Sequence, residues 1–190
     1  MIRILLVSIV IGLLGCSKAP VLKVYSLNIP TIEMATSHRY SSKTVKVTFP
    51  QSLREQMSQK MNFSYSNNDR GTYQNSEWSN NTSKLLQGTF IEVLDNAKVF
   101  KAVLSDTTTL KTNYRLESNI FAFEHRVRDA LSHAIISIQF TLINADTGVL
   151  VKSKRFSYQE ATQSINAEGY ASATNVAMSR LSRDLVVWLR

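Results

Sequence analysis

Residues 135–158, IISIQFTLINADTGVLVKSKRFSY, decide the fold. Two runs rich in β-branched, aromatic and alternating polar residues, 135–144 and 149–158, flank the tetrapeptide ADTG. Gly148 occupies the position of this turn that needs a positive φ angle, which glycine adopts without steric cost. The stretch therefore predicts an antiparallel β-hairpin of two strands.

Several other segments show the alternation or the β-branched and aromatic content of strands. They are 23–29, 43–49, 60–66, 71–77, 99–104 and 114–125. The segments 60–66 and 71–77 flank the polar sequence NNDR, which predicts a second hairpin. Pro50 is expected to end the strand at 43–49, because proline donates no backbone hydrogen bond.

Two segments have the apolar period of helices. In 79–98 the apolar side chains fall on one face, and Gln87 falls on the opposite, polar face. The residues that offer N-cap oxygens to this helix are Ser79, Asn80 and Asn81. In 166–189 a narrow apolar stripe runs from Tyr170 to Trp188, typical of a helix packed on a sheet. The expected fold class is α+β, a mixed or antiparallel sheet with two main helices packed on it.

The first sixteen residues, MIRILLVSIVIGLLGC, have the features of an export signal. Arg3 supplies a positive charge, 4–14 is apolar, and Gly15 is a small residue before the cysteine. The apolar run is shorter than the roughly 20 residues that span a bilayer. The sequence Leu13-Leu14-Gly15-Cys16 looks like a bacterial lipobox, in which the thiol becomes a diacylglyceryl thioether and the cysteine becomes the acylated first residue. The alternatives are an ordinary secretory signal with a chance cysteine and an uncleaved anchor.

Cleavage before Cys16 divides the chain into a signal peptide at 1–15, an acylated cysteine and short tether at 16–22, and a single domain at 23–190. The 190 residues suffice for one domain with a sizeable core. Because Cys16 is the only cysteine, no internal disulfide can form, and packing must stabilise the domain. Ser17 after the cysteine favours the outer membrane over the inner membrane.

No recognisable active site is present in the sequence. The three histidines, His38, His125 and His133, have no second histidine or carboxylate at metal-ligand spacing, which indicates surface or packing residues. There is no glycine-rich phosphate loop and no GxSxG elbow. We expect no catalytic residue, no metal and no cofactor, and therefore a protein that is not an enzyme.

The chain is basic, with a formal net charge of +8. This charge would suit anionic lipid headgroups, peptidoglycan-associated polymers or an acidic partner, whereas nucleic acid is not expected outside the cytoplasm. The densest cluster, KSKR at 152–155, is interpreted as a solvated strand face in preference to a binding patch. The aromatic stretch from Phe63 to Trp78 is interpreted as core in preference to a ligand wall or partner surface.

The order of features resembles one protein family. After the lipobox come VYSLNI, VKVTFP, an aromatic hairpin ending in SEW, the helix TSKLLQGTFIEVL, then YRLESNIFAFEH, DTGVLVKSKRFSY and a closing helix ending in VVWLR. Over most of the mature chain this order resembles the ABC-type transport auxiliary lipoproteins, the PqiC-like partners of MCE proteins. The resemblance marks Tyr73, Trp78 and Trp188 as structural or interface residues.

The resemblance implies a lipoprotein on the periplasmic face of the bacterial cell envelope, attached through acylated Cys16. It implies a non-catalytic docking or receiving module for an MCE-family protein and for ABC transporter or permease subunits. The implied cargo is phospholipid or another hydrophobic molecule, and a homo-oligomer is compatible with this role. The alternatives are a lipoprotein that binds peptidoglycan or regulates cell-wall synthases, and an anchored hydrolase.

Overall fold

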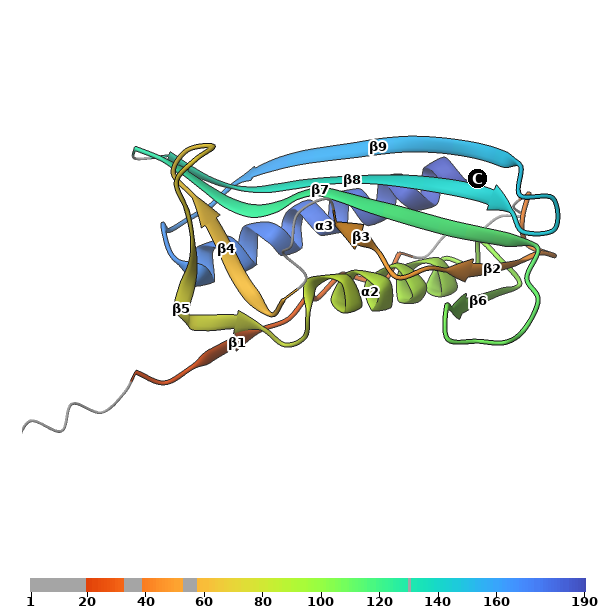
Figure 1. Ribbon diagram of the computed structural model, residues 1–190, viewed down its shortest axis with the longest axis horizontal. Helices are drawn as coiled ribbons and strands as arrows, with labels where there is room; N and C mark the ends of the chain where they lie inside the picture. Colours follow the sequence, from red (N-terminus) through yellow and green to blue (C-terminus); the bar gives the residue numbers. More distant parts are fainter. Residues whose placement is uncertain (1–19, 33–38, 53–57, 130) are drawn as a thin grey trace, which may run out of the picture.

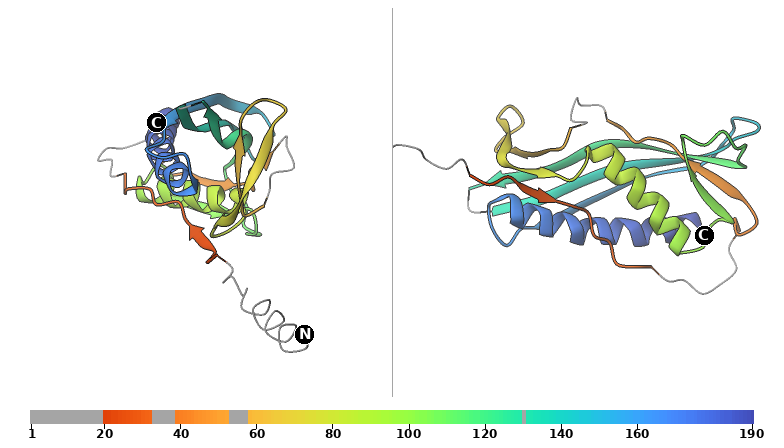
Figure 2. Two further views of the ribbon diagram at one scale, coloured as in Figure 1. Left: turned by 90° about the vertical axis from the view of Figure 1, so that its left-hand side faces the viewer. Right: turned by 90° about the horizontal axis from the view of Figure 1, so that it is seen from below.

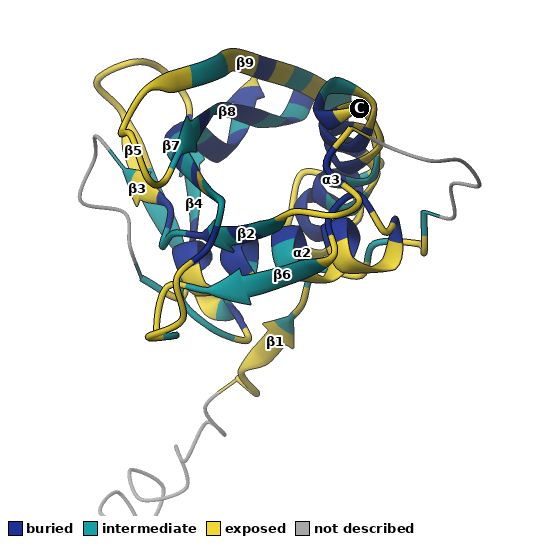
Figure 3. Ribbon diagram, turned by 90° about the vertical axis from the view of Figure 1, so that its right-hand side faces the viewer, coloured by how far each residue is buried: buried dark blue, intermediate teal, exposed yellow. Residues whose placement is uncertain are grey.

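The computed structural model describes residues 20–32, 39–52, 58–129 and 131–190, which form an α+β fold. A long, curved sheet of nine strands covers two helices, α2 (Thr82–Asn96) and α3 (Ala167–Leu189) (Figure 1). Seen along its length, the molecule has its buried residues on the inner face of the sheet and on the helix sides that face it (Figure 3). The expected fold class is therefore confirmed. The predicted signal peptide and Cys16 lie outside the described residues.

The three longest strands of the sheet form two consecutive antiparallel pairs: β7 (Tyr114–Arg128), β8 (Leu131–Asn144) and β9 (Leu150–Ala161). The predicted hairpin is the β8–β9 pair, and Gly148 in its turn has a φ of +70°. The strands β7 and β8 are longer than predicted and meet at a tight turn, in which Asp129 has a φ of +53°. Their length gives the molecule its long axis.

The shorter strands extend the sheet beyond β7. They are β1 (Lys23–Tyr25), β2 (Thr44–Val47), β3 (Gln51–Ser52), β4 (Lys60–Ser64), β5 (Arg70–Trp78) and β6 (Ala102–Ser105). The β4–β5 hairpin is antiparallel as predicted, and β4 joins β7 in parallel. Strand β2 lies between β6 and β7, while β1 pairs in parallel with β5. The two-residue strand β3, which follows Pro50, was not predicted.

Each helix begins directly after an asparagine that caps it, and Asn81 is one of the N-cap candidates predicted for the first helix. The Asn81 side chain accepts a hydrogen bond from the backbone N–H of Lys84 at 2.8 Å, so Asn81 is the N-cap of α2. The Asn166 side chain accepts one from Gly169 N–H at 2.9 Å and caps α3. Each bond satisfies one of the free N–H groups of a first helical turn.

One prediction about α2 is wrong. Gln87, assigned to the polar face, is buried. Its Nε2 donates to the Val47 carbonyl oxygen at 3.0 Å and to Asp106 Oδ1 at 2.9 Å. A buried amide is tolerated when such partners satisfy it, and here it joins α2 to β2 and to the segment after β6. The core beside it is apolar, with Phe90 of α2 packed edge-on against Phe140 of β8.

Candidate functional site

The sequence predicts one lipid-attachment residue and three structural or interface residues, and the structure describes the latter three. Cys16 lies outside the described residues. Trp78, at the end of β5, is 1% exposed and packs against Phe123 and Tyr170, with ring centroids 5.7 Å and 5.6 Å away. In this chain its indole ring therefore faces the core and is not accessible to a partner at the surface.

Trp188 lies in the last turn of α3 and is half-buried. Its ring packs edge-on against Phe156 of β9, and the Lys152 ammonium lies 5.2 Å from the ring centroid. Lys152 Nζ also donates to the Trp188 carbonyl oxygen at 2.7 Å, where a positive charge complements the negative end of the helix dipole. Trp188 thus joins the C-terminus of α3 to β9.

Tyr73 belongs to a buried cluster that the sequence did not reveal. Its hydroxyl lies 2.7 Å from Nδ1 of His125, a fully buried residue of β7. The imidazole stacks on the ring of Tyr170 at 5.3 Å with an interplanar angle of 2°. Burial is the main cause that lowers the pKa of His125 to about 4, and burial raises the pKa of Tyr73 to about 12. Both groups are therefore neutral near pH 7, and their rings pack against one another inside the fold.

A buried ion network lies beside this cluster. The Glu124 side chain is 4% exposed and receives Arg126 Nη2 at 2.7 Å and Arg70 Nη1 at 3.1 Å. Arg70 begins β5, whereas Glu124 and Arg126 are in β7, so the network ties the β4–β5 hairpin to the central strands. Two cations around one carboxylate compensate for its removal from water.

The KSKR sequence does not form one basic patch. Neighbouring residues of a strand point to opposite faces, and the four side chains of 152–155 have different partners. Lys152 lies against the end of α3, whereas Arg155 Nε donates to Ser137 Oγ at 2.8 Å and its guanidinium lies 3.8 Å from the Phe121 ring centroid. The positive charges are therefore distributed over two sides of β9.

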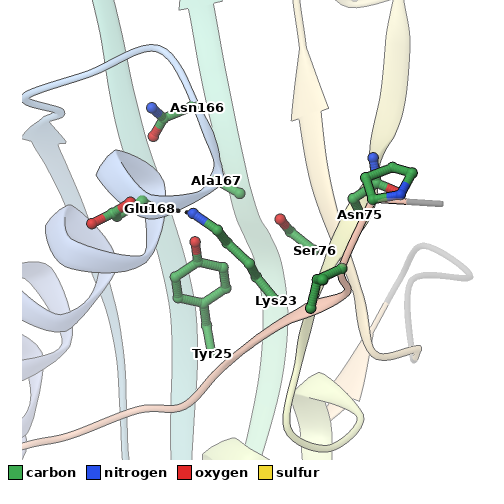
Figure 4. Close-up of a pocket in the computed structure, with 9 residues that line it drawn as sticks. Lys23, Tyr25, Asn75, Ser76, Asn166, Ala167 and Glu168 are labelled. Carbon is green, nitrogen blue, oxygen red and sulfur yellow. Dashed lines mark ion pairs between the residues drawn. The ribbon is translucent and has the colours of Figure 1, made fainter. Parts of the chain in front are cut away.

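Two open pockets lie at opposite ends of the long axis. One, of about 420 Å³, lies between β1, β5 and the N-terminus of α3 (Figure 4). In it Lys23 points toward Glu168, and their Nζ and Oε2 atoms are 3.8 Å apart (Figure 4). Lysine, tyrosine, asparagine and serine side chains face this pocket, but no nucleophile is paired with a general base there. We call this end of the molecule, from which residue 20 leads to the sequence start, the tether end.

The second pocket, of about 450 Å³, lies at the opposite end, which we call the distal end. It is formed by β2, the β6–β7 connection and the β8–β9 turn, and its cations are Lys46, Lys111 and Arg115. Lys46 Nζ donates to the Thr108 carbonyl oxygen at 3.1 Å, and Arg115 pairs with Glu117 at 2.7 Å. The nearby side chains of Leu110, Val149 and Leu150 are exposed. Cationic and apolar groups together suit an acidic or amphiphilic partner surface.

Within the described ranges, no three His, Cys, Asp or Glu side chains are grouped so that they could hold a metal ion. No helix in those ranges is both long and apolar enough to cross a membrane.

A family model described as the ABC-type transport auxiliary lipoprotein component matches residues 25–186. The chain belongs to this family. The match confirms the resemblance that the order of sequence features indicated, and it makes the protein a member of a family of transport auxiliary lipoproteins. No curated protein matches the chain in sequence.

Solved structures share the fold of this family member. Protein XCC0632 from Xanthomonas campestris is 18% identical and has a TM-score of 0.78, over 87% of this chain and 94% of that one. An uncharacterized protein is 12% identical with a TM-score of 0.68, over 90% and 100% of the two chains. The hypothetical protein CT253 from Chlamydia trachomatis is 7% identical with a TM-score of 0.51, over 78% and 95%. At these identities the similarity establishes the fold alone.

Proposed function

We propose that this protein is a membrane-anchored, non-catalytic auxiliary component of an ABC/MCE-type intermembrane lipid transport system. The observation that supports this role is the match of residues 25–186 to the ABC-type transport auxiliary lipoprotein family. The partners are an MCE-family protein and ABC transporter or permease subunits, and the cargo is phospholipid or another hydrophobic molecule. The protein acts as their docking or receiving module.

The anchor in this proposal is acylated Cys16, on the periplasmic face of the cell envelope and preferentially at the outer membrane. Each buried CH₂ group of an acyl chain contributes about 0.8 kcal/mol, so several chains on one residue hold a domain stably on a bilayer. Pro20, the first described residue, is four positions after Cys16. The anchor therefore holds the tether end near the membrane and leaves the distal end available to a partner.

We place the partner contact at the distal end. The pocket has three cationic lining residues against one acidic one, Asp146, which leaves it positive. Leu110, Val149 and Leu150 give this end apolar area that water does not favour. Exposed apolar side chains beside a cationic pocket supply both kinds of contact, apolar and polar, that protein interfaces combine. The buried Tyr73–His125 cluster offers no such surface.

The test is site-specific photo-crosslinking in living cells. A photoreactive amino acid replaces Leu110 or Val149 at the distal end in the tagged full-length chain, and Val176, an exposed residue of α3, is the matched control. We expect the distal-end positions to capture an MCE protein or ABC transporter subunits, identified by mass spectrometry after affinity purification. Capture of this chain by itself at those positions would indicate a homo-oligomer and a different contact surface.

The net charge of +8 favours one other candidate, a lipoprotein that binds peptidoglycan or regulates cell-wall synthases. Retention of the protein on isolated sacculi distinguishes the two. Recovery of cell-wall enzymes alone by the distal-end crosslinkers, together with retention on sacculi, would replace the transport role with this one.

A further inference from the structure

The tether end exposes apolar side chains from four separate segments. Val21 precedes β1, Tyr65 follows β4, Leu131 begins β8 and Ile165 precedes the N-cap of α3. These side chains are 85%, 54%, 68% and 51% exposed, respectively. Figures 1 and 2 show from different directions that the start of β1, the β4–β5 hairpin, the β7–β8 turn and the start of α3 lie at the same end.

The charged groups at this end nearly cancel one another. Lys23 pairs with Glu168, and the two arginines Arg70 and Arg126 pair with Glu124. The remaining charged side chains of the adjoining turns are Asp69, Arg128 and Asp129. Because the charges of these described residues balance, they give the tether end no strong net charge that would attract an acidic macromolecule. Its exposed features are apolar side chains among short polar turns, which suits the boundary between lipid headgroups and acyl chains.

The sequence limits how far this end can lie from its anchor. An extended chain covers at most about 3.6 Å per residue, so the four positions from Cys16 to Pro20 span at most about 14 Å. The headgroup region of one leaflet is about 5–8 Å thick, so residue 20 can lie at most about 10 Å beyond it. Acylated Cys16 would therefore hold the tether end against the headgroups of its own bilayer.

We propose that the tether end is a membrane-contact surface, with Leu131, Ile165 and Tyr65 inserted among the phospholipid headgroups of the bilayer that holds Cys16. The proposal rests on the proposed function only through the acylation of Cys16. The domain then stands with its long axis away from the membrane, and the anchor and the inserted side chains together fix this orientation. The distal end consequently points into the periplasm.

The test uses the acylated full-length mature protein in vesicles of phosphatidylethanolamine and phosphatidylglycerol. An acylated Cys16 thiol cannot react with a maleimide, so a cysteine introduced elsewhere is labelled alone. The variants are Leu131→Cys and Ile165→Cys at the tether end, with Val149→Cys at the distal end as the matched exposed control. Each is labelled with an environment-sensitive fluorophore, and the vesicles contain phospholipid with a nitroxide near the headgroup.

We expect severalfold stronger nitroxide quenching and a blue-shifted emission at positions 131 and 165 than at position 149. Equal, weak quenching at all three positions would overturn the membrane-contact surface. Maleimide labelling of the unsubstituted protein, or its absence from the vesicles, would instead show that Cys16 is not acylated, and the anchor in the proposed function would fail. The unsubstituted protein could stay on the vesicles without being labelled while the fluorophores at positions 131 and 165 are not quenched. This result would overturn the membrane-contact surface and leave the anchor in place.

Discussion

The Tyr73 hydroxyl and the Nδ1 atom of His125 lie 2.7 Å apart, joining β5 to β7 inside the fold although 52 positions separate them in sequence. His125 has no contact with water, and Nε2 on the other side of its ring is buried without a hydrogen-bond partner in the described part of the chain. Protonation of this imidazole would bury a positive charge, which explains the direction of its pKa shift.

This cluster predicts acid sensitivity. The pKa of His125 is about 4 in the fold, below its ordinary value of about 6.5. Between these values the unfolded chain takes up a proton that the folded chain does not, so the free energy of unfolding falls by up to about 3 kcal/mol as the pH decreases from 6.5 to 4. Urea denaturation across this range measures it. A His125→Gln variant should lose most of this pH dependence, and an unchanged slope would contradict the prediction.

Trp78 is expected to matter for stability. Because it is buried between Phe123 and Tyr170, Trp78→Ala should lower the free energy of unfolding by about 3–5 kcal/mol. Trp188→Ala, at a half-buried position, is the matched comparison and should cost less. Denaturant unfolding of the two variants measures the difference. A Trp78→Ala variant of wild-type stability would show that the indole is not part of the core.

Glu124 balances the positive charges of two arginines. Replacing it with a neutral residue should therefore lower the free energy of unfolding more than the same replacement of an exposed glutamate. Glu124→Gln is expected to lower the free energy of unfolding by about 1.5–3 kcal/mol, the range for hydrogen bonds to charged groups. Glu117→Gln, which removes the exposed pair with Arg115, is the control and should cost less than about 1 kcal/mol. Similar losses in the two variants, measured by thermal and urea unfolding, would argue against a special role for the buried network.

Replacing the glycine of each helix with alanine should change the stability of the protein in opposite directions. A Cβ on Gly169 would overlap the backbone carbonyl oxygen of Ser164, which cannot move aside like a flexible side chain, so Gly169→Ala should destabilise the start of α3. A Cβ on Gly88, within α2, would meet no atom within 4 Å, so Gly88→Ala should stabilise the protein by about 0.5–1 kcal/mol. Melting temperatures of the two variants should therefore shift in opposite directions. Shifts of the same sign would contradict this prediction.

Cys16→Ser tests the anchor directly. Without the thiol no diacylglyceryl thioether can form, so the variant should leave the membrane fraction or accumulate as an unprocessed precursor. Membrane fractionation and the mass of the purified chain measure these outcomes, with Ser17→Ala as a neighbouring control. Normal processing and membrane retention of Cys16→Ser would exclude the lipoprotein anchor.

Local patterns were sufficient for the parts of the fold that depend on nearby residues. The ADTG turn predicted the β8–β9 hairpin, because Gly148 supplies the positive φ angle that its position requires. Asn81 was one of the predicted N-cap candidates, since its side chain can reach the third N–H of the following helix. Strand ends were less accurate, since β7 and β8 continue as far as their pairing allows.

The sequence could not reveal contacts that depend on distant pairing. His125 has no neighbouring partner in sequence, and it meets Tyr73 only because β7 pairs in parallel with β4, which in turn pairs with β5. Helical periodicity assigns Gln87 to the exposed face, yet the Val47 carbonyl oxygen and Asp106 provide it with buried partners. The charge pattern likewise did not show that the KSKR side chains would be divided between two sides of β9.

The parallel pairing of β1 with β5 has a mechanical consequence. Tyr25 lies opposite Trp78 in this pair, its carbonyl oxygen accepts from Ser79 N–H at 2.7 Å, and farther along Asn28 N–H donates to Asn175 Oδ1 of α3 at 2.8 Å. A pull on residue 20 along β1 loads these bonds in shear, so they must fail together, whereas a peeling force would break them one at a time. Tension between a membrane and a partner would thus be transmitted to the sheet and α3, and the start of the domain would not unfold first.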